Sequence, residues 1–316
     1  MKYLSATRLS VLTVLALSTP LLLAGCGGTL GSDGSGAGPR VVASFYPLEY
    51  VAERVAGDHA EVVNLTSPGV EPHDLELTVR QTAEVSDADL VVYEKDLQPA
   101  VDEAVAEHGP DQVVEASEVV ELAPLSPGEH EGESEEEHAD HAESDADLHF
   151  WLDPERMTTL AAEVQDRMSE IDPDNAADYQ ANFEALRNDL TEVDAAYEEG
   201  LADCEINTVV VSHDAFGYLE KYGLHFESIA GLSPDAEPSA SHLAELGELI
   251  EDEGITTVFS ETLASPAMAE TLARDLGIET AVLDPIEGPS DEGATEDYLS
   301  LMRTNLEELE EANRCR

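Results

Sequence analysis

Four side chains that commonly bind transition metals stand out in this sequence because each lies in a distinctive local setting. They are His73, His149, His213 and Asp284. Three imidazoles and one carboxylate form a natural tetrahedral ligand set for Zn²⁺. These residues lie far apart along the chain, so a metal site exists only if the fold brings them together.

Short apolar, β-branched segments alternate with amphipathic segments along the chain of 316 residues. In the first half, the pattern predicts strands at 41–46, 61–65, 90–93 and 112–115, with helices at 48–56, 78–86 and 99–107. The second half repeats the plan, with strands at 208–212, 225–229, 257–260 and 280–283 and helices at 215–221, 240–253, 266–276 and 297–313. This alternation predicts an α/β fold with mainly parallel sheets.

Two helices are predicted between these halves. The first covers residues 154–171, and Asp172 followed by Pro173 marks the start of the second. A helix of about 28 residues would be about 42 Å long at 1.5 Å per residue. We therefore expect an N-terminal metal-binding lobe at 40–171, a long rigid linking helix at 172–202 and a C-terminal metal-binding lobe at 203–316.

The N-terminus has the features of an export signal. Lys2 and Arg8 precede an apolar run that is short for a membrane span and ends at Cys26. The sequence Leu-Ala-Gly-Cys at 23–26 resembles a bacterial lipoprotein signal, in which the cysteine carries the lipid. Residues 1–25 are thus predicted to be a signal peptide, and the glycine-rich stretch 26–39 a flexible tether. An ordinary signal peptide with a chance cysteine is the alternative.

The formal charge of −56 is extreme for a chain that is 42% hydrophobic. Such a surface repels nucleic acid and anionic lipid headgroups and concentrates cations. Adaptation to a salty habitat, or solubility alone, would explain the same composition. The charge therefore excludes nucleic-acid binding without identifying a function.

Residues 129–147 are rich in acidic residues and contain His130, His138 and His141, with no large apolar side chain. We expect this loop to be disordered without a ligand, because it has nothing to bury. The two remaining cysteines, Cys204 and Cys315, are predicted to form a disulfide outside the cytoplasm. Two unrelated thiols are the alternative.

The candidate ligands follow predicted strands. His73 follows the strand at 61–65, while His213 and Asp284 end the strands at 208–212 and 280–283. His149 lies between the acidic loop and the helix that begins at Pro154. Because ligands of open α/β sheets bind beyond the carboxyl ends of strands, these positions predict one site in a cleft between the lobes.

Several motifs occur together in a specific order. They are Pro-His at 72–73, His-Phe-Trp-Leu-Asp-Pro at 149–154, Ser-His-Asp-Ala-Phe at 212–216, Glu-Pro-Ser at 237–239 and Leu-Asp-Pro at 283–285. As a set, they resemble the zinc/manganese class of solute-binding lipoproteins that serve ABC importers, over residues 40–312. One departure from that pattern is the segment 91–97, which concerns the local loop geometry and not the metal site.

The resemblance implies two Rossmann-like lobes, a long helical backbone and one transition-metal ion in the cleft, held by His73, His149, His213 and Asp284. It implies a high-affinity monomer anchored by lipid to the outer face of the cell membrane. The implied partners are an ABC permease and, through it, a cytoplasmic ATPase. The acidic loop is similar to loops of zinc-specific members, so we expect it to collect zinc weakly; a tolerated insertion without a role is the alternative.

A histidine at position 213 gives a set of three nitrogens and one oxygen, which favours zinc over manganese. The chain is thus predicted to bind Zn²⁺ as a transported ligand and not to be an enzyme. A manganese- or iron-binding importer component remains an alternative. So do a zinc-dependent hydrolase, with Glu71 or Glu261 as the base, and a surface adhesin.

Overall fold

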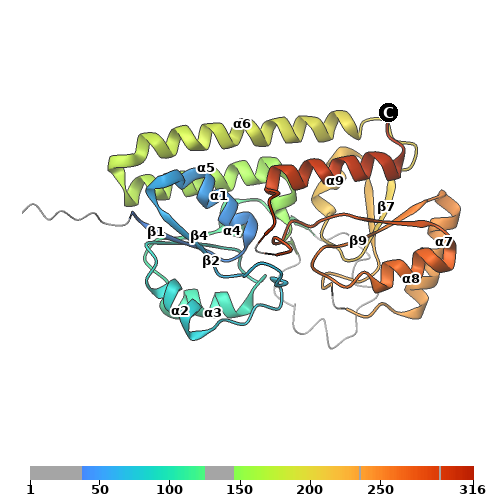
Figure 1. Ribbon diagram of the computed structural model, residues 1–316, viewed down its shortest axis with the longest axis horizontal. Helices are drawn as coiled ribbons and strands as arrows, with labels where there is room; N and C mark the ends of the chain where they lie inside the picture. The colour runs from blue at the N-terminus through green and yellow to red at the C-terminus, as the bar shows by residue number, and fades with distance from the viewer. Residues whose placement is uncertain (1–37, 125–145, 235, 292) are drawn as a thin grey trace, which may run out of the picture. The chain divides into compact units, whose positions relative to one another are not determined.

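The short β-branched segments form two parallel sheets in the computed structural model, which describes residues 38–124, 146–234, 236–291 and 293–316 (Figure 1). The strands are β1 (Arg40–Ala43), β2 (Glu61–Asn64), β3 (Leu90–Tyr93), β4 (Val113–Glu115), β5 (Ala123–Pro124), β6 (Ala146–Asp147), β7 (Thr208–Val211), β8 (His225–Ser228), β9 (Thr257–Ser260) and β10 (Glu279–Val282). The first sheet has the order β2-β1-β3-β4 and the second the order β10-β9-β7-β8, while β5 and β6 form an antiparallel ladder.

The helices alternate with these strands. The α-helices are α1 (Tyr46–Ala56), α2 (Val79–Ser86), α3 (Pro99–His108), α4 (Ala116–Val119), α5 (Pro154–Ile171), α6 (Ala176–Gly200), α7 (Ala240–Glu253), α8 (Ala267–Leu276) and α9 (Tyr298–Asn313). The 3₁₀ helices are η1 (Gly57–His59), η3 (Phe150–Leu152), η4 (Pro173–Asn175) and η5 (Gly217–Tyr222). The predicted α/β class with two mainly parallel sheets and a long helix is confirmed.

Helices cover both faces of each parallel sheet. Successive side chains of a strand point to opposite faces, so neighbouring residues pack against different helices. In β1, Val42 packs in a cluster with α2 and α3, whereas Val41 packs in the cluster that contains α1, α5 and α6. In β7, Val210 likewise packs with α7 and α8, whereas Val209 faces the side of α6 and α9. Figure 1 shows α2 and α3 on one side of the first sheet and α5 and α6 on the other.

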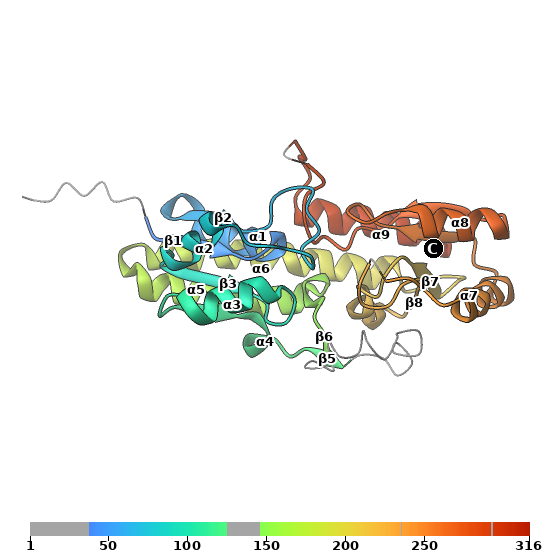
Figure 2. The ribbon, with the colours of Figure 1, turned by 90° about the horizontal axis from the view of Figure 1, so that it is seen from below.

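Helix α6 connects the two halves through one continuous apolar cluster. Its buried face includes Phe183, Leu186, Leu190, Val193 and Tyr197, and these residues belong to the same cluster as the inner faces of both sheets. With 25 residues, α6 is about 37 Å long. It packs on α1, α5 and α9 (Figure 2). Residues Ala37–Arg316 form one compact unit, and the lobe boundaries at 171 and 202 stay predictions.

Two helix predictions differ from the structure. The linking helix begins at Ala176, because Pro173–Asn175 form a 3₁₀ turn before it. The segment predicted as a helix at 215–221 is the 3₁₀ helix η5, with bonds from Leu219 N to Phe216 O and from Gly223 N to Glu220 O. Gly223, at φ 95°, ends it in the left-handed region that glycine adopts without strain.

The described part of the chain contains no helix that is both long enough and apolar enough to cross a bilayer. Its C-terminal end is fixed to the segment that follows α6. Cys204 and Cys315 form a disulfide, and the backbone N–H groups of Glu205 and Ile206 donate to Asn313 O. The last helix is therefore tied both covalently and by hydrogen bonds to the start of the second sheet.

We predict that Cys315→Ser lowers the free energy of unfolding by about 2–5 kcal/mol, because the bridge closes a loop with a sequence separation of 111 residues. Urea unfolding of the metal-free chain under non-reducing conditions measures this. Cys204→Ser should have the same effect, and the double variant should lose no more than either single variant. Equal midpoints for the wild type and Cys315→Ser would contradict the prediction.

Candidate metal centre

Three of the four predicted ligands converge in the structure. Ligand atoms of His73, His149, His213 and Glu287 all lie within 4.8 Å of one another. His73 belongs to the irregular segment between β2 and α2, and His149 lies between β6 and η3. His213 follows β7, and Glu287 follows β10. The cluster thus draws on both halves of the chain, as the positions of the histidines predicted.

One carboxylate oxygen of the cluster lies close to all three imidazoles. Glu287 Oε1 lies 3.3 Å from His73 Nε2, 3.6 Å from His213 Nε2 and 3.7 Å from His149 Nε2. The edge of a tetrahedron with metal–ligand bonds of 2.0–2.1 Å is about 3.3 Å. The three distances from Glu287 Oε1 are therefore close to the edge of a tetrahedral zinc site with three nitrogens and one oxygen.

Keeping these polar side chains buried without a partner costs free energy, which a bound cation would offset. The exposed fraction is 0% for His213, 1% for Glu287 and 2% for His149. His149 Nε2 and His213 Nε2 are buried without a hydrogen-bond partner, although buried polar atoms are normally paired. Two lone-pair donors aimed at one point beside a carboxylate are what a Zn²⁺ ion requires.

Each of these two buried imidazoles contacts a carboxylate on its other side. His213 Nδ1 lies 2.7 Å from Glu261 Oε1, and His149 Nδ1 lies 2.8 Å from Asp147 Oδ1. A carboxylate at Nδ1 accepts the ring proton there and leaves Nε2 free to bind a metal.

The charges of the cluster stabilise one another. Burial alone would lower the pKa of His213, but Glu261 and Glu287 beside it raise that pKa well above its ordinary value. Burial alone would raise the pKa of Glu287, but His213 and His73 hold that pKa well below its usual range. Burial and the charge of Glu287 raise the pKa of Glu71 to about 7, against the opposing effect of His73. The imidazoles of His213 and His73 and the carboxylate of Glu287 thus favour one another's charged forms.

Asp284 does not belong to the cluster, so the structure corrects the predicted fourth ligand. Its Oδ1 accepts the backbone N–H of Ile286 at 2.7 Å, and its Oδ2 accepts the Thr262 hydroxyl at 2.7 Å. Ile286 has a φ of 60°, in the left-handed region that a β-branched residue rarely adopts. This turn sends the chain back toward the histidines, and Glu287 follows it into the site.

The sequence contained only a weak signal for Glu287. An acidic residue four positions after the end of a predicted strand is common in so acidic a chain. The left-handed conformation at Ile286 places Glu287 and not Asp284 beside the histidines. Position 286 holds neither glycine nor asparagine, the residues that usually indicate such a conformation. His130, His138, His141 and Cys26 lie outside the residues that the structure describes.

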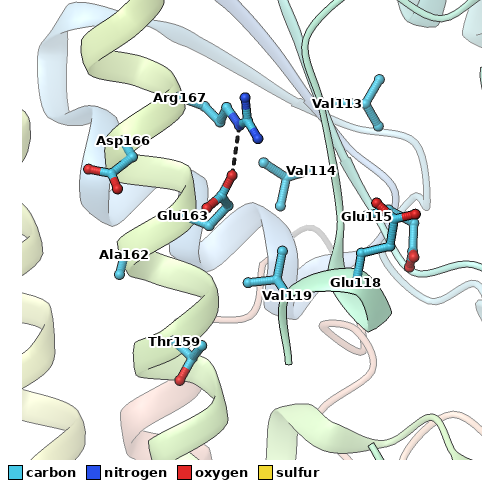
Figure 3. Close-up of a pocket in the computed structure, with 10 residues that line it drawn as sticks. All are labelled: Val113, Val114, Glu115, Glu118, Val119, Thr159, Ala162, Glu163, Asp166 and Arg167. Carbon is cyan, nitrogen blue, oxygen red and sulfur yellow. Dashed lines mark hydrogen bonds and ion pairs between the residues drawn. The ribbon is translucent and has the colours of Figure 1, made fainter. Parts of the chain in front are cut away.

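A separate surface hollow of about 450 Å³ lies between the β4–α4 segment and α5 (Figure 3). Its walls carry Glu115, Glu118, Glu163 and Asp166, and Arg167 forms an ion pair with Glu163 at 2.7 Å. It shares no residue with the histidine cluster. None of its lining side chains has a buried unpaired polar atom within the described ranges, so it offers no comparable ligand set.

Comparisons with known proteins agree with this geometry. Residues 41–312 match the family described as ZnuA, zinc-uptake complex component A, periplasmic. The zinc-binding lipoprotein AdcA of Streptococcus pneumoniae is 36% identical over 305 residues, which are 94% of this chain and 60% of that protein. The high-affinity zinc uptake system protein ZnuA of Bacillus subtilis is 35% identical over 303 residues, covering 92% of this chain and 94% of that one.

Solved structures show the same relationship. The Zn(II)-bound ZnuA-like domain of Streptococcus pneumoniae AdcA has a TM-score of 0.72 and 34% identity, covering 88% of this chain and 99% of that domain. A second match is the laminin-binding protein Lmb of Streptococcus agalactiae, which is described as bifunctional with adhesin and metal transporting activity. It has a TM-score of 0.74 and 26% identity, covering 87% of this chain and 99% of that one. The chain spans about 60% of the length of AdcA. The family match over residues 41–312, together with the fold and the histidine cluster, shows that the chain belongs to the ZnuA family of zinc-uptake component A proteins.

Proposed function

We propose that this chain captures one Zn²⁺ ion outside the cytoplasm and delivers it to the permease of an ABC importer. The observation that carries the proposal is the buried cluster of His73, His149, His213 and Glu287. Three imidazoles and one carboxylate suit zinc, whereas manganese prefers oxygen-rich sites of higher coordination. The names of AdcA and of ZnuA support zinc as the cargo.

Transport fits the ligand set better than hydrolysis does. A catalytic zinc site usually keeps one coordination position open for water, while a closed site has four protein ligands. Here Glu287 lies at the fourth corner of the site. The four ligands come from segments in both halves of the chain, so binding the ion draws these segments together. The adhesin alternative has only the description of Lmb behind it and is not proposed.

The same proposal places the protein at a membrane surface. Residues 23–26 resemble a lipoprotein signal, and we propose that Cys26 carries the lipid and that residues 26–39 act as the tether. Such an anchor would keep the metal-binding part near its permease, and a cytoplasmic ATPase would drive transfer through that permease. The long helix α6 is a stiff element, so capture and release should involve small shifts of the ligand segments.

The fourth ligand is tested by a matched pair of variants, Glu287→Gln and Asp284→Asn. We predict that Glu287→Gln weakens zinc binding by about 100-fold or more, because about 10–16 kcal/mol of binding free energy is shared by four ligands. Asp284→Asn should bind within about threefold of the wild type, because the asparagine Oδ1 can still accept from Ile286 N. Metal analysis and competition titration with a chromophoric chelator measure both.

The same two variants test delivery. In cells that lack the protein, the wild type and Asp284→Asn should restore zinc uptake from zinc-depleted medium, and Glu287→Gln should not. Uptake restored equally by Glu287→Gln would contradict the proposed site. A wild-type chain that binds zinc but restores no uptake would contradict the proposed transport.

Zinc affinity should fall as the pH falls, because protons and zinc compete for the same Nε2 atoms. The neighbouring carboxylates, among them Glu287, raise the pKa values of His213 and His73 above the ordinary value for histidine, so competition starts above that value. The low pKa of Glu287 keeps its carboxylate charged throughout. We predict about a tenfold loss of affinity, or more, for each pH unit between about pH 8 and pH 6. Competition titrations across this range measure it, and a flat profile would contradict it.

We further propose that the stretch 129–147 collects zinc ions weakly beside the site. Two observations support this proposal. The stretch is rich in acidic residues and contains three histidines, and its last residue, Asp147, contacts the His149 ring. We predict that deleting residues 129–145 removes the weakly bound ions and leaves one tight ion with unchanged affinity. Uptake at scarce zinc should fall, as measured with radioactive zinc. Unchanged uptake would show that the stretch is a tolerated insertion.

A further inference from the structure

The two buried histidines share a feature that His73 lacks. One oxygen of Glu261 accepts both the backbone N–H of His213 at 3.0 Å and its ring Nδ1 at 2.7 Å. One oxygen of Asp147 likewise accepts the backbone N–H of His149 at 2.9 Å and its ring Nδ1 at 2.8 Å. Each carboxylate thus holds the main chain and the ring of its histidine in one fixed relation.

The position of Glu261 follows from the pairing of the second sheet. Val210 of β7 is the register partner of Val258 of β9. His213 lies three residues after Val210, and Glu261 lies three residues after Val258. The two residues are therefore side by side just beyond the carboxyl ends of adjacent parallel strands. Glu261 is itself only 7% exposed, and its contact with His213 is closed to water.

The position of Asp147 is fixed from the other half of the chain. Tyr218 in η5 donates its hydroxyl proton to Asp147 O at 2.7 Å and accepts from Ala123 N at 2.8 Å. It therefore holds both strands of the β5–β6 ladder. A Cβ atom at Gly217 would lie 2.9 Å from Asp147 Oδ2, so a larger residue there would displace this carboxylate.

His73 is held differently. Its backbone N–H donates to Glu71 Oε2 at 3.0 Å, which is the same relation to an acid two residues earlier that His149 has. Its ring, however, contacts Glu287 through Nε2 at 3.3 Å, and the described residues place no carboxylate against its Nδ1. Its side chain is 21% exposed, compared with 3% for His149 and 0% for His213.

From these contacts, we infer that Glu261 and Asp147 are positioning residues that hold His213 and His149 as a preformed pair, with each Nε2 aimed at the metal, while His73 and Glu287 complete the site. The inference rests on the proposed zinc-binding function and deepens it. Because a carboxylate only accepts, the proton stays on Nδ1 and the metal meets the lone pair of Nε2. A ligand pair ordered before binding lowers the entropy cost of binding.

The test compares Glu261→Ala, Glu261→Gln and Glu227→Gln. The alanine variant removes the acceptor, and we expect zinc affinity to fall about 10–100-fold. The glutamine variant keeps an amide oxygen that can accept from Nδ1, so it should recover most of that loss. Glu227→Gln is the matched control, since Glu227 contacts the exposed His225 ring at 3.0 Å outside the cluster. It should leave affinity unchanged.

Imidazole NMR provides a readout that a general loss of stability would not produce. In the wild type and in Glu261→Gln, His213 should show a slowly exchanging Nδ1–H proton, in both the metal-free and the zinc-loaded chain. In Glu261→Ala that signal should disappear or exchange rapidly, while the melting curve stays cooperative. The visible spectrum of the cobalt-substituted chain should change in the same variant. Asp147→Asn and Asp147→Ala repeat the comparison at His149.

Wild-type affinity and an unchanged Nδ1–H signal in Glu261→Ala would overturn the inference. So would an equal loss of affinity in Glu261→Gln and Glu261→Ala, since that would make the role one of general stability. If Glu261→Ala fails to fold, the Asp147 variants decide by the same two readouts. A wild-type chain that binds no zinc would overturn the proposed function instead, and the metal-free NMR signals would still decide the positioning role.

Discussion

The structure depends on a buried carboxylate that is surrounded by three imidazoles. Glu287 is almost fully excluded from solvent, and a buried charge without a partner costs several kcal/mol. Neighbouring carboxylates raise the pKa values of His213 and His73, and these histidines lower the pKa of Glu287, so positively charged imidazoles would offset that cost. A zinc ion would supply the same positive charge at the same place. Protons and zinc would therefore compete for the same Nε2 atoms of this cluster.

The segments of His149, His213 and Glu287 hold their positions because all three rest on the large apolar core that both sheets share. Trp151 shows the connection most clearly. Its ring lies 4.8 Å from that of Phe45 and 5.1 Å from that of His149, and its Nε1 donates to Pro285 O at 2.7 Å. Tyr298 donates its hydroxyl proton to Trp151 O at 2.6 Å. One aromatic side chain thus links the first sheet, a histidine ligand and the turn that carries Glu287.

The extreme acidity of the chain and its metal site have separate roles. A formal charge of −56 attracts every cation and distinguishes none of them. Selection comes from the ligand atoms, because three nitrogens and one oxygen at tetrahedral spacing suit zinc and leave manganese with too few oxygens. Asp147 and Glu261 have a different role from both, because their carboxylates contact the histidine ligands and not the place where the ion would bind.

The sequence alone determined the secondary structure and three of the four members of the cluster. Strands and helices follow from hydrophobic periodicity, which is a local property, and they were predicted within a few residues of their observed ends. Periodicity does not separate η5, a 3₁₀ helix of six residues, from an α-helix. It also did not predict α4 or the β5–β6 ladder, and β6 lies at the end of the stretch 129–147 that was expected to be disordered. His73, His149 and His213 could be found because each lies in a short motif, and two of them follow predicted strands.

Only the tertiary structure decided the fourth member and the groups that hold the histidines. Asp284 uses its carboxylate on its own turn, and Ile286 adopts a left-handed conformation that periodicity cannot predict. Asn305 in α9 fixes that turn by bonding to Asp284 N at 2.9 Å and to Asp284 O at 2.7 Å. The contact between Glu261 and His213 depends on the register of strands 48 residues apart in sequence. The contact between Asp147 and His149 is local, but those made by Glu261 and Asn305 are set by how distant segments pack.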